Sequence, residues 1–471
     1  MADGLTISGG GVVAVATDEL IARSLALDHV ASEAEGCVGQ LAGIAALGAG
    51  SGVFSSPDAL SAGREVERAG ALLAGVRSSS AAAAAALREA ATNYGRLERA
   101  LENAGQQLSA TLGYAAGWFL PGLALSVLPA SVIAVGALFA AAVLHPGGAR
   151  AARAAMGDWL RQHRGVLSSP FTVALLRSAV SSADDAGAGL ARVPPGLARL
   201  LGDEGLGLTG LETSAALLAL VGSRFGVFAE TPVTVRPTVR ALGVSPPTGI
   251  AERVERIPDP KGNAYGEQLV IERYSVEGGP DRFEVYLGGT VDFSPVASGE
   301  VWDLTSNVAG IAELPAGSYR AAREALADAG VTPSSPVVFT GYSQGGLIAT
   351  ALASSGDYAT EGLVTVGAPA GQILLPERLP VIAIEHTDDL VPAFGGHRVN
   401  HESVVVEREA FAGVPLPADR AVPAHDLAVY RRTAELADAA VSDRLARAVS
   451  AIDWREEISR SETTSYLAER G

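Results

Sequence analysis

Residues 341–345, Gly-Tyr-Ser-Gln-Gly, place one serine between two glycines in a G-x-S-x-G pattern. A serine hydroxyl on a sharp turn can act as a nucleophile once a base accepts its proton. The run Val337–Phe339 predicts a buried strand before the pattern, and apolar residues at helical spacing begin at Leu347. A chain with 55 glycines can contain the pattern by chance, so a plain glycine-rich turn is the alternative. The flanking strand and helix favour a nucleophile at Ser343.

A nucleophilic serine needs a base and a carboxylate. A neutral imidazole is a suitable base near pH 7, and a buried carboxylate fixes the tautomer of that imidazole. The histidines that follow the serine are His386, His397, His401 and His425. Two acidic residues, Asp388 and Asp389, precede a predicted strand at 403–407. His425 is the candidate base because it follows that strand, whereas we expect His397 and His401 to be structural or to face solvent.

Strand-like and helix-like segments alternate from residue 268 onward. The expected strands are 268–276, 282–287, 337–339, 363–366, 381–385 and 403–407, and helices are expected after Ser343 and at 318–329 and 426–437. Residues 277–281 join the first two strands and predict an antiparallel hairpin. The later alternation predicts an α/β fold with a mostly parallel sheet covered by helices on both faces.

This order of elements resembles the α/β-hydrolase fold over residues 261–445, in particular the lipase and cutinase-like serine esterases. In such enzymes the triad runs serine, aspartate, histidine, each on a loop after a strand. Ser343, Asp389 and His425 match that order. Asp389 stands directly before Leu-Val-Pro, as the catalytic aspartate stands before similar triplets in lipases, and Asp388 is then a turn or capping residue.

An acyl-transfer intermediate also needs two hydrogen-bond donors at its oxyanion. The backbone N–H of Gln344, directly after the serine, is one candidate. The resemblance places the second donor at Thr290, where Gly288-Gly289-Thr290 follows an early strand and the threonine hydroxyl can add to the site. A tight turn without a catalytic role is the alternative for these three residues. The chemistry that the resemblance implies uses neither a metal nor a cofactor.

The composition of the 471-residue chain restricts the classes of partner. Its formal net charge of −17 argues against nucleic acid, because phosphate binding needs clustered Lys and Arg. A single cysteine, Cys37, excludes an internal disulfide framework and a cysteine-rich zinc site. The N-terminus lacks a positively charged stretch followed by an apolar run, so we expect no cleavable secretory signal.

Residues 1–110 predict a helical hairpin. Asp18 can cap a first helix that is apolar at seven-residue spacing, and a second helix is expected from Ser56–Asp58 onward. In the second helix apolar residues recur at alternating spacings of three and four residues, and Ser80 is the one polar residue in that series. Such helices should pack as an antiparallel pair.

This hairpin resembles the WxG-type helical hairpins of type VII secretion systems. Tyr94–Glu98 matches the Y-x-x-x-[DE] export signal of that family, although no tryptophan lies in the turn between the helices. Tyr94 also falls in the apolar series, so a packed core residue is the alternative. The resemblance implies contact with secretion machinery and export by a non-classical route.

Residues 111–146 form an apolar segment without Asp, Glu, Lys or Arg. A membrane-spanning helix needs about 20 apolar residues, so the segment favours a membrane-associated protein. A helix pair buried within protein is the alternative. A slight excess of arginines after the segment places its C-terminal side in the cytoplasm, which conflicts with export of a hydrolase.

The remaining segments complete the domain organisation. Helices are expected at 151–162, 171–182 and 211–221 within residues 147–260, which end in a proline-rich linker from Pro232 to Pro260. Residues 446–471 are expected to form a C-terminal helical tail.

These features together predict a serine hydrolase that cleaves a carboxylic ester through an acyl-enzyme. Lipid or acyl esters are favoured because the chain looks membrane-associated. The rival interpretation makes the N-terminal half the functional part, in a type VII secretion-linked interaction or toxin protein whose hydrolase domain is degenerate or cargo.

Overall fold

The chain divides into two compact units, Gly11–Gln106 and the combination of Met1–Gly10 with Gln107–Gly471. This computed structural model describes residues 5–9, 12–50, 61–85, 87–88, 148–181, 228–260, 262, 266–293, 297–312, 314–400, 402–454 and 458–471. Five features predicted above lie outside these residues: the helix start at Ser56–Asp58, the Tyr94 motif, the apolar segment 111–146, the helix 211–221 and His401.

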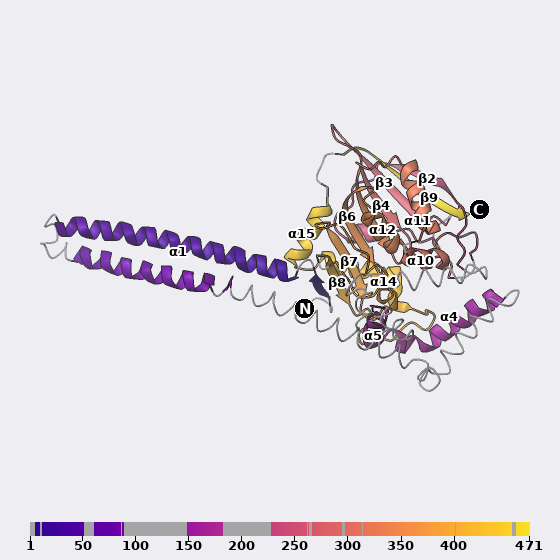
Figure 1. Cartoon of the computed structure of the whole chain (residues 1–471), viewed down its shortest axis with the longest axis horizontal. Coiled ribbons are helices and arrows are strands. Elements are labelled where there is room, and N and C mark those ends of the chain that lie inside the picture. Colours follow the sequence, from indigo (N-terminus) through magenta and orange to yellow (C-terminus); the bar gives the residue numbers. More distant parts are fainter. Residues whose placement is uncertain are drawn as a thin grey trace, which may run out of the picture. The chain divides into compact units, whose positions relative to one another are not determined.

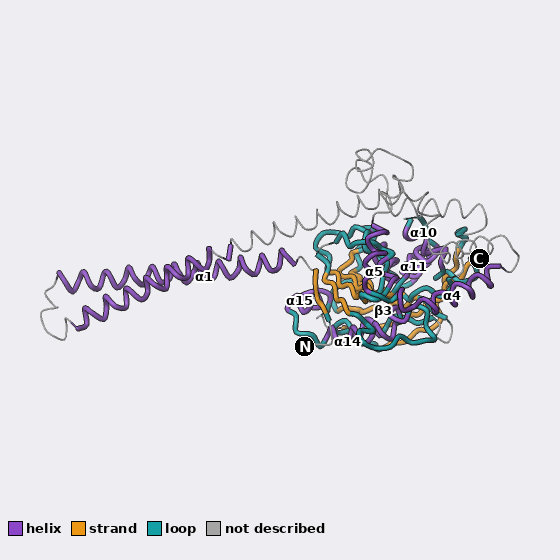
Figure 2. Tube along the Cα trace, turned by 90° about the horizontal axis from the view of Figure 1, so that it is seen from below, coloured by secondary structure: helices purple, strands orange, loops and turns teal. Residues whose placement is uncertain are grey.

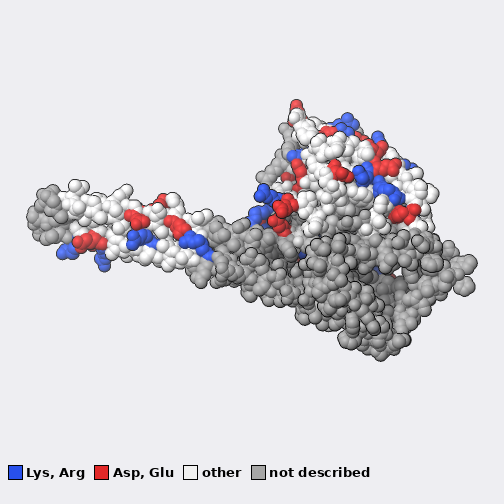
Figure 3. All heavy atoms as spheres, in the orientation of Figure 1, with Lys and Arg blue, Asp and Glu red and all other residues white. Residues whose placement is uncertain are grey.

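The smaller unit is a helical hairpin. Helix α1 (Val12–Gly50) runs beside a second helix that includes residues 61–85 (Figures 1 and 2). Ion pairs join Arg77 to Glu35 and Arg88 to Asp28. Arg88, the later residue of the second helix, pairs with Asp28, the earlier residue of α1, so the two helices run in opposite directions. The predicted antiparallel arrangement is therefore confirmed. Acidic and basic side chains lie close together on the outside of the hairpin (Figure 3).

Small side chains form the seam of this hairpin. Among the hairpin residues that the structure describes, those that are buried are Ser24, Ala31, Ala34, Ser80 and Ala84. Residues of this size let two helices approach closely but bury little apolar area. Ser80, the one polar residue of the predicted series, therefore lies in the seam. Helix α1 begins at Val12, before the predicted start at Asp18.

The larger unit contains a nine-stranded sheet with the order β1-β8-β7-β6-β5-β4-β3-β9-β2. In that order the strands are Thr6–Gly9, Val404–Arg408, Val381–His386, Ala359–Val366, Pro336–Tyr342, Arg282–Leu287, Leu269–Val276, Ile458–Arg470 and Val233–Leu242. Strands β4 to β8 pair in parallel, each with the next strand along the chain. Antiparallel pairs join β3 to β4, β3 to β9, β2 to β9 and β1 to β8. The parallel strands β4 to β8 and the antiparallel start at β3 are as predicted, whereas the antiparallel strands β1, β9 and β2 were not predicted.

Helices cover both faces of this sheet, which makes a three-layer α/β structure (Figure 1). One face carries α11 (Gly317–Asp328) and α12 (Gln344–Ser354), with α10 (Leu304–Ile311) packed against both. The other face carries α9 (Ala251–Glu255), α14 (Leu427–Asp438) and α15 (Asp443–Ile452). Neighbouring strand residues point into opposite layers, so Leu363 belongs to one core and Val364 to the other. The central strands therefore place apolar residues on both of their faces.

Two helices from the predicted 147–260 region are confirmed, and one of them packs beside the sheet. Helix α4 spans Gly148–Leu167 and α5 spans Pro170–Ser181. Val173 of α5 contacts α13 (Leu390–Ala393), the short helix that follows β7.

The proline-rich linker predicted at 232–260 is wrong, because this segment contains β2 and α9. Strand β2 lies at the edge of the sheet, and its register shifts by one residue between Pro237 and Val239. A proline has no N–H for the ladder, but an edge strand with a bulge tolerates it. The prolines therefore did not exclude a strand.

The predicted helical tail at 446–471 is also wrong beyond Ile452. Residues 458–470 form β9, which lies between β3 and β2. Every second residue from 464 to 470 is buried, namely Thr464, Tyr466, Ala468 and Arg470. A period of two is the pattern of a strand with one covered face, and it outweighs the helical tendency of the last residues.

No helix in the described part of the chain is long and apolar enough to cross a membrane. Because the apolar segment 111–146 lies outside that part, membrane association stays a prediction.

Candidate active site

Ser343 occupies the sharp turn between β5 and α12. Its backbone has φ 54° and ψ −121°, which is a strained conformation for a residue with a side chain. The flanking glycines allow the turn, since a Cβ at Gly341 would collide with the backbone of Gly345 and one at Gly345 with that of Leu287. The turn thus holds the hydroxyl at the carboxyl end of a central parallel strand.

His425 connects this hydroxyl to a carboxylate. Its Nε2 lies 2.8 Å from Ser343 Oγ, and its Nδ1 lies 2.6 Å from Asp389 Oδ2. Since a carboxylate can only accept, Nδ1 carries a proton and Nε2 of the neutral ring accepts from the serine. Tyr342 stacks on the imidazole with ring centroids 5.1 Å apart and donates from its hydroxyl to the His425 carbonyl. The structure brings the three predicted residues together in the order that proton transfer requires.

Asp389 follows β7 and is fully buried. The backbone N–H of Val391 donates to its Oδ1 at 2.9 Å, and the Tyr430 hydroxyl donates to its Oδ2 at 2.7 Å. Burial raises the pKa of Tyr430 well above its usual value, so the phenol stays protonated and remains a donor. Tyr430 is a site residue that sequence reasoning missed, because a tyrosine inside an amphipathic helix carries no signal of a polar partner.

Asp388, the neighbouring carboxylate, has a different task. Its two oxygens accept from the backbone N–H groups of Ala410 and Phe411, at 2.8 and 3.0 Å. These bonds fix the loop that follows β8. Asp388 is therefore the turn residue of the pair in this structure, and Asp389 is the carboxylate that contacts the imidazole.

A second histidine, His386, binds the backbone directly before His425. Its Nδ1 lies 2.6 Å from the carbonyl oxygen of Ala424, directly before His425, and its Nε2 lies 2.7 Å from Thr433 Oγ1. The ring stacks on Tyr430 with centroids 3.8 Å apart. Burial lowers the pKa of His386 to about 4, so the ring is neutral when the protein is folded near pH 7.

The depressed pKa of His386 predicts acid sensitivity of the fold. Between the ordinary pKa of 6.5 and about 4, the unfolded chain binds a proton that the folded chain does not. The free energy of unfolding should therefore fall as the pH falls through this window. Chemical denaturation of wild type and His386→Gln between pH 7.5 and 4 measures the effect, and the variant should show a shallower slope. Equal slopes in wild type and His386→Gln would refute the assignment.

Both predicted oxyanion donors belong to segments that adjoin Ser343. Gln344 is the first residue of α12, and the first amides of a helix have no intrahelical acceptor. Gly289, directly before Thr290, packs against the serine: a Cβ there would lie 3.2 Å from Ser343 Cβ. Thr290 Oγ1 accepts from Asn307 Nδ2 at 2.9 Å, which leaves the threonine proton available for another acceptor.

The comparisons with known proteins add no assignment: no family model, curated protein or solved structure matches this chain. A serine hydroxyl bonded to a neutral imidazole, itself bonded to a buried carboxylate, can attack a carbonyl carbon at neutral pH. Among the residues that the structure describes, no group of His, Cys, Asp or Glu side chains is arranged to hold a metal ion.

Proposed function

We propose that the protein is a serine hydrolase that cleaves carboxylic esters through an acyl-enzyme. The observation that carries this proposal is the unbroken pair of contacts from Ser343 Oγ to His425 Nε2 and from His425 Nδ1 to Asp389 Oδ2. The strained backbone at Ser343 supports it, since strain of this kind concentrates at functional sites.

In the proposed reaction Ser343 Oγ attacks the ester carbonyl while His425 Nε2 takes the hydroxyl proton. Asp389 stabilises the imidazolium, and the amide of Gln344 with Thr290 stabilises the negative oxygen. The C–O bond to the alcohol then breaks, and His425 returns the proton to the leaving oxygen. Water repeats the sequence on the acyl-enzyme, releasing the acid and restoring the serine.

The arrangement of the sheet supports an α/β-hydrolase-like interpretation. The serine follows β5, the aspartate follows β7 and the histidine follows β8, and these strands run parallel. Ligands of open α/β sheets bind outside the carboxyl ends of the strands, where these loops converge. An apolar cluster next to the serine, which includes Leu347 and Ala368 with partly buried Ile311 and Ile373, can contact an aliphatic acyl group.

A fluorophosphonate probe provides the direct test of this function. The proposal requires covalent labelling of Ser343, identified by peptide mass spectrometry, and hydrolysis within a chain-length series of p-nitrophenyl esters. Denatured protein is the control for non-specific labelling. An intact protein that neither labels nor hydrolyses any member of the series would favour the rival, in which the hydrolase domain is degenerate.

A second candidate function concerns the hairpin, which forms a compact unit of its own. We propose that Gly11–Gln106 is an interaction module, and contact with secretion machinery is what its resemblance to WxG-type hairpins suggests. Deletion of this unit should then abolish export while ester hydrolysis by the rest of the chain persists. Loss of both activities together would argue that the two units are not functionally separate.

The apolar segment carries a separate prediction. Deleting residues 111–144 should move the protein from the membrane fraction to the soluble fraction, because a charge-free run longer than about 20 residues favours the bilayer. Fractionation with alkaline and detergent washes measures the change, and Ile133→Arg is the point variant that should weaken retention. Full-length protein that is soluble without detergent would instead favour a segment buried within protein.

A further inference from the structure

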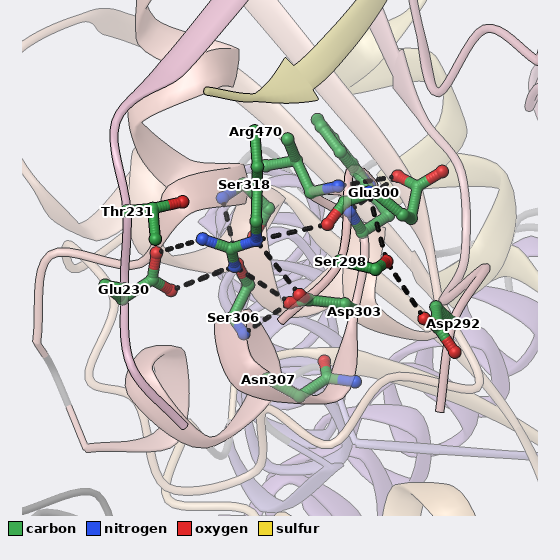
Figure 4. A network of polar contacts seen from close by, with 12 residues as sticks. Glu230, Thr231, Asp292, Ser298, Glu300, Asp303, Ser306, Asn307, Ser318 and Arg470 are labelled. Carbon is green, nitrogen blue, oxygen red and sulfur yellow. Dashed lines mark hydrogen bonds and ion pairs between the residues drawn. The ribbon is translucent and has the colours of Figure 1, made fainter. Parts of the chain in front are cut away.

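A buried arginine on β9 contacts the start of α10. The side chain of Arg470 is 2% exposed and lies between the carboxylates of Glu230 and Asp303 (Figure 4). Its Nε and Nη2 donate to the two oxygens of Asp303, each at 3.0 Å, and Nη1 donates to Glu230 at 2.7 Å. Nη2 also donates to Ser306 Oγ at 2.9 Å. One guanidinium thus fixes residues 303 and 306 together.

Both residues belong to the first turn of α10. Asp303 caps the helix by accepting from the Ser306 amide at 2.8 Å, so its carboxylate serves the helix and the arginine at once. One helical turn from the cap, Asn307 donates to Thr290 Oγ1. The backbone oxygen of Asp303 accepts from the side chain of Gln344 at 3.3 Å. The capped turn therefore touches both residues that the proposed mechanism uses to bind the oxyanion.

We infer that Arg470 is a positioning residue for the oxyanion hole, acting through the first turn of α10. The inference rests on the proposed hydrolase function. Arg470 reaches Thr290 through Asp303 and Asn307, and it reaches Gln344 through the Asp303 backbone. A donor displaced by even about 1 Å from its productive position costs a large factor in rate, so the rigidity of this turn matters to catalysis.

Only arginine fits this position. A guanidinium offers five donors in a rigid planar fork, and four of its N–H groups have partners here among Glu230, Asp303, Ser306 and the Glu300 carbonyl. A lysine keeps the positive charge between the two carboxylates but cannot bind both oxygens of Asp303 and Ser306 together. Arg470→Lys therefore preserves the charge balance of the cluster and loosens the turn.

A double-mutant cycle with Thr290 tests the inference. In wild type, Arg470→Lys should lower kcat about tenfold with KM within about twofold, because an oxyanion donor acts in the transition state. In the Thr290→Ala background the same change should lower kcat by less than about threefold, because the donor that the turn positions is already gone. A merely structural arginine would lower kcat by the same factor in both backgrounds, and that result would overturn the inference.

Arg253 is the matched control. Its side chain is 1% exposed and pairs with Glu284 and Asp453. Its other hydrogen bonds within the described part of the chain go to the carbonyls of Gly249 and Ile452, away from α10. Arg253→Lys should lower the thermal midpoint at least as much as Arg470→Lys while leaving kcat within about twofold. Equal losses of kcat in the two lysine variants would mean that general destabilisation explains the effect, against the inference.

Two further measurements keep the outcome decisive. If Arg470→Lys does not fold, Ser306→Ala can replace it, because it removes the hydroxyl that accepts from Arg470. Ser306→Ala should then lower kcat less in the Thr290→Ala background than in wild type. An equal loss of kcat in both backgrounds would refute the inference. Wild-type protein that is folded but unlabelled by the fluorophosphonate probe would overturn the hydrolase function, and this inference with it. If wild type is active but the effects of Arg470→Lys and Thr290→Ala on kcat are additive, only the role inferred for Arg470 is overturned.

Discussion

Replacing Ser343 with alanine should lower ester hydrolysis by at least about 10⁴-fold. The alanine has no oxygen to form the acyl-enzyme, and His425 can at best activate a water molecule in its place. The fold should change little, because the side chain makes one hydrogen bond to described residues, the one to His425, and alanine adopts the positive φ at the same cost as serine. The thermal midpoint should therefore stay within about 4 °C of wild type.

The measurement compares kcat/KM on a p-nitrophenyl ester with the thermal midpoint for each protein. Ser354→Ala is the matched control on the same helix, since that exposed serine donates only to the Leu374 carbonyl. It should retain wild-type activity. A Ser343→Ala protein that hydrolyses esters at more than about a tenth of the wild-type rate would rule out Ser343 as the nucleophile.

The sequence predicted the central part of the sheet well. Strands β4 to β7 are covered on both faces, so each contains a short stretch of β-branched, aliphatic or aromatic residues that stands out between turns and helices. Strands β2 and β9 were missed because they are partly exposed and rich in Thr, Arg and Glu. Each of them is stabilised by pairing with a segment more than 180 residues distant in the chain, as Leu269 with Tyr466 shows. Such pairing leaves no local trace in the pattern.

The candidate site likewise contains residues that could be predicted from the sequence and residues that could not. Ser343, Asp389 and His425 could be predicted because each lies on a loop with a recognisable neighbourhood. Tyr430 and His386 could not, because their roles depend on which buried groups they meet. Arg470 acts at still longer range, across 167 residues to Asp303. A single sequence identifies reacting groups more readily than the groups that hold them.

The sharpest distinction in the site is between two adjacent carboxylates. Asp389 and Asp388 are both buried and both accept backbone hydrogen bonds. Only Asp389 contacts the imidazole, at 2.6 Å from His425 Nδ1, and also accepts from the Tyr430 hydroxyl. An asparagine at 389 keeps the shape but removes the negative charge, and its amide can hold the ring in the wrong tautomer.

Asp389→Asn should therefore lower the acylation rate by at least about a hundredfold, as should His425→Ala. Asp388→Asn should cost less than about tenfold, because it disturbs only the loop at 410–411. The adjacent position and equal change in charge make it the matched control.

The effects should also be strongly non-additive. Once Ser343 is alanine, removing His425 as well should cost less than about threefold more, because the two residues act as one unit in proton transfer. Stopped-flow acylation of the single variants, with steady-state hydrolysis for the double variant, measures both claims. A large loss in Asp388→Asn beside a normal rate in Asp389→Asn would transfer the acid role to Asp388. Because Asp388 reaches the backbone of the β8 loop and not the imidazole, that outcome would require a different arrangement of the loops after β7 and β8 during catalysis.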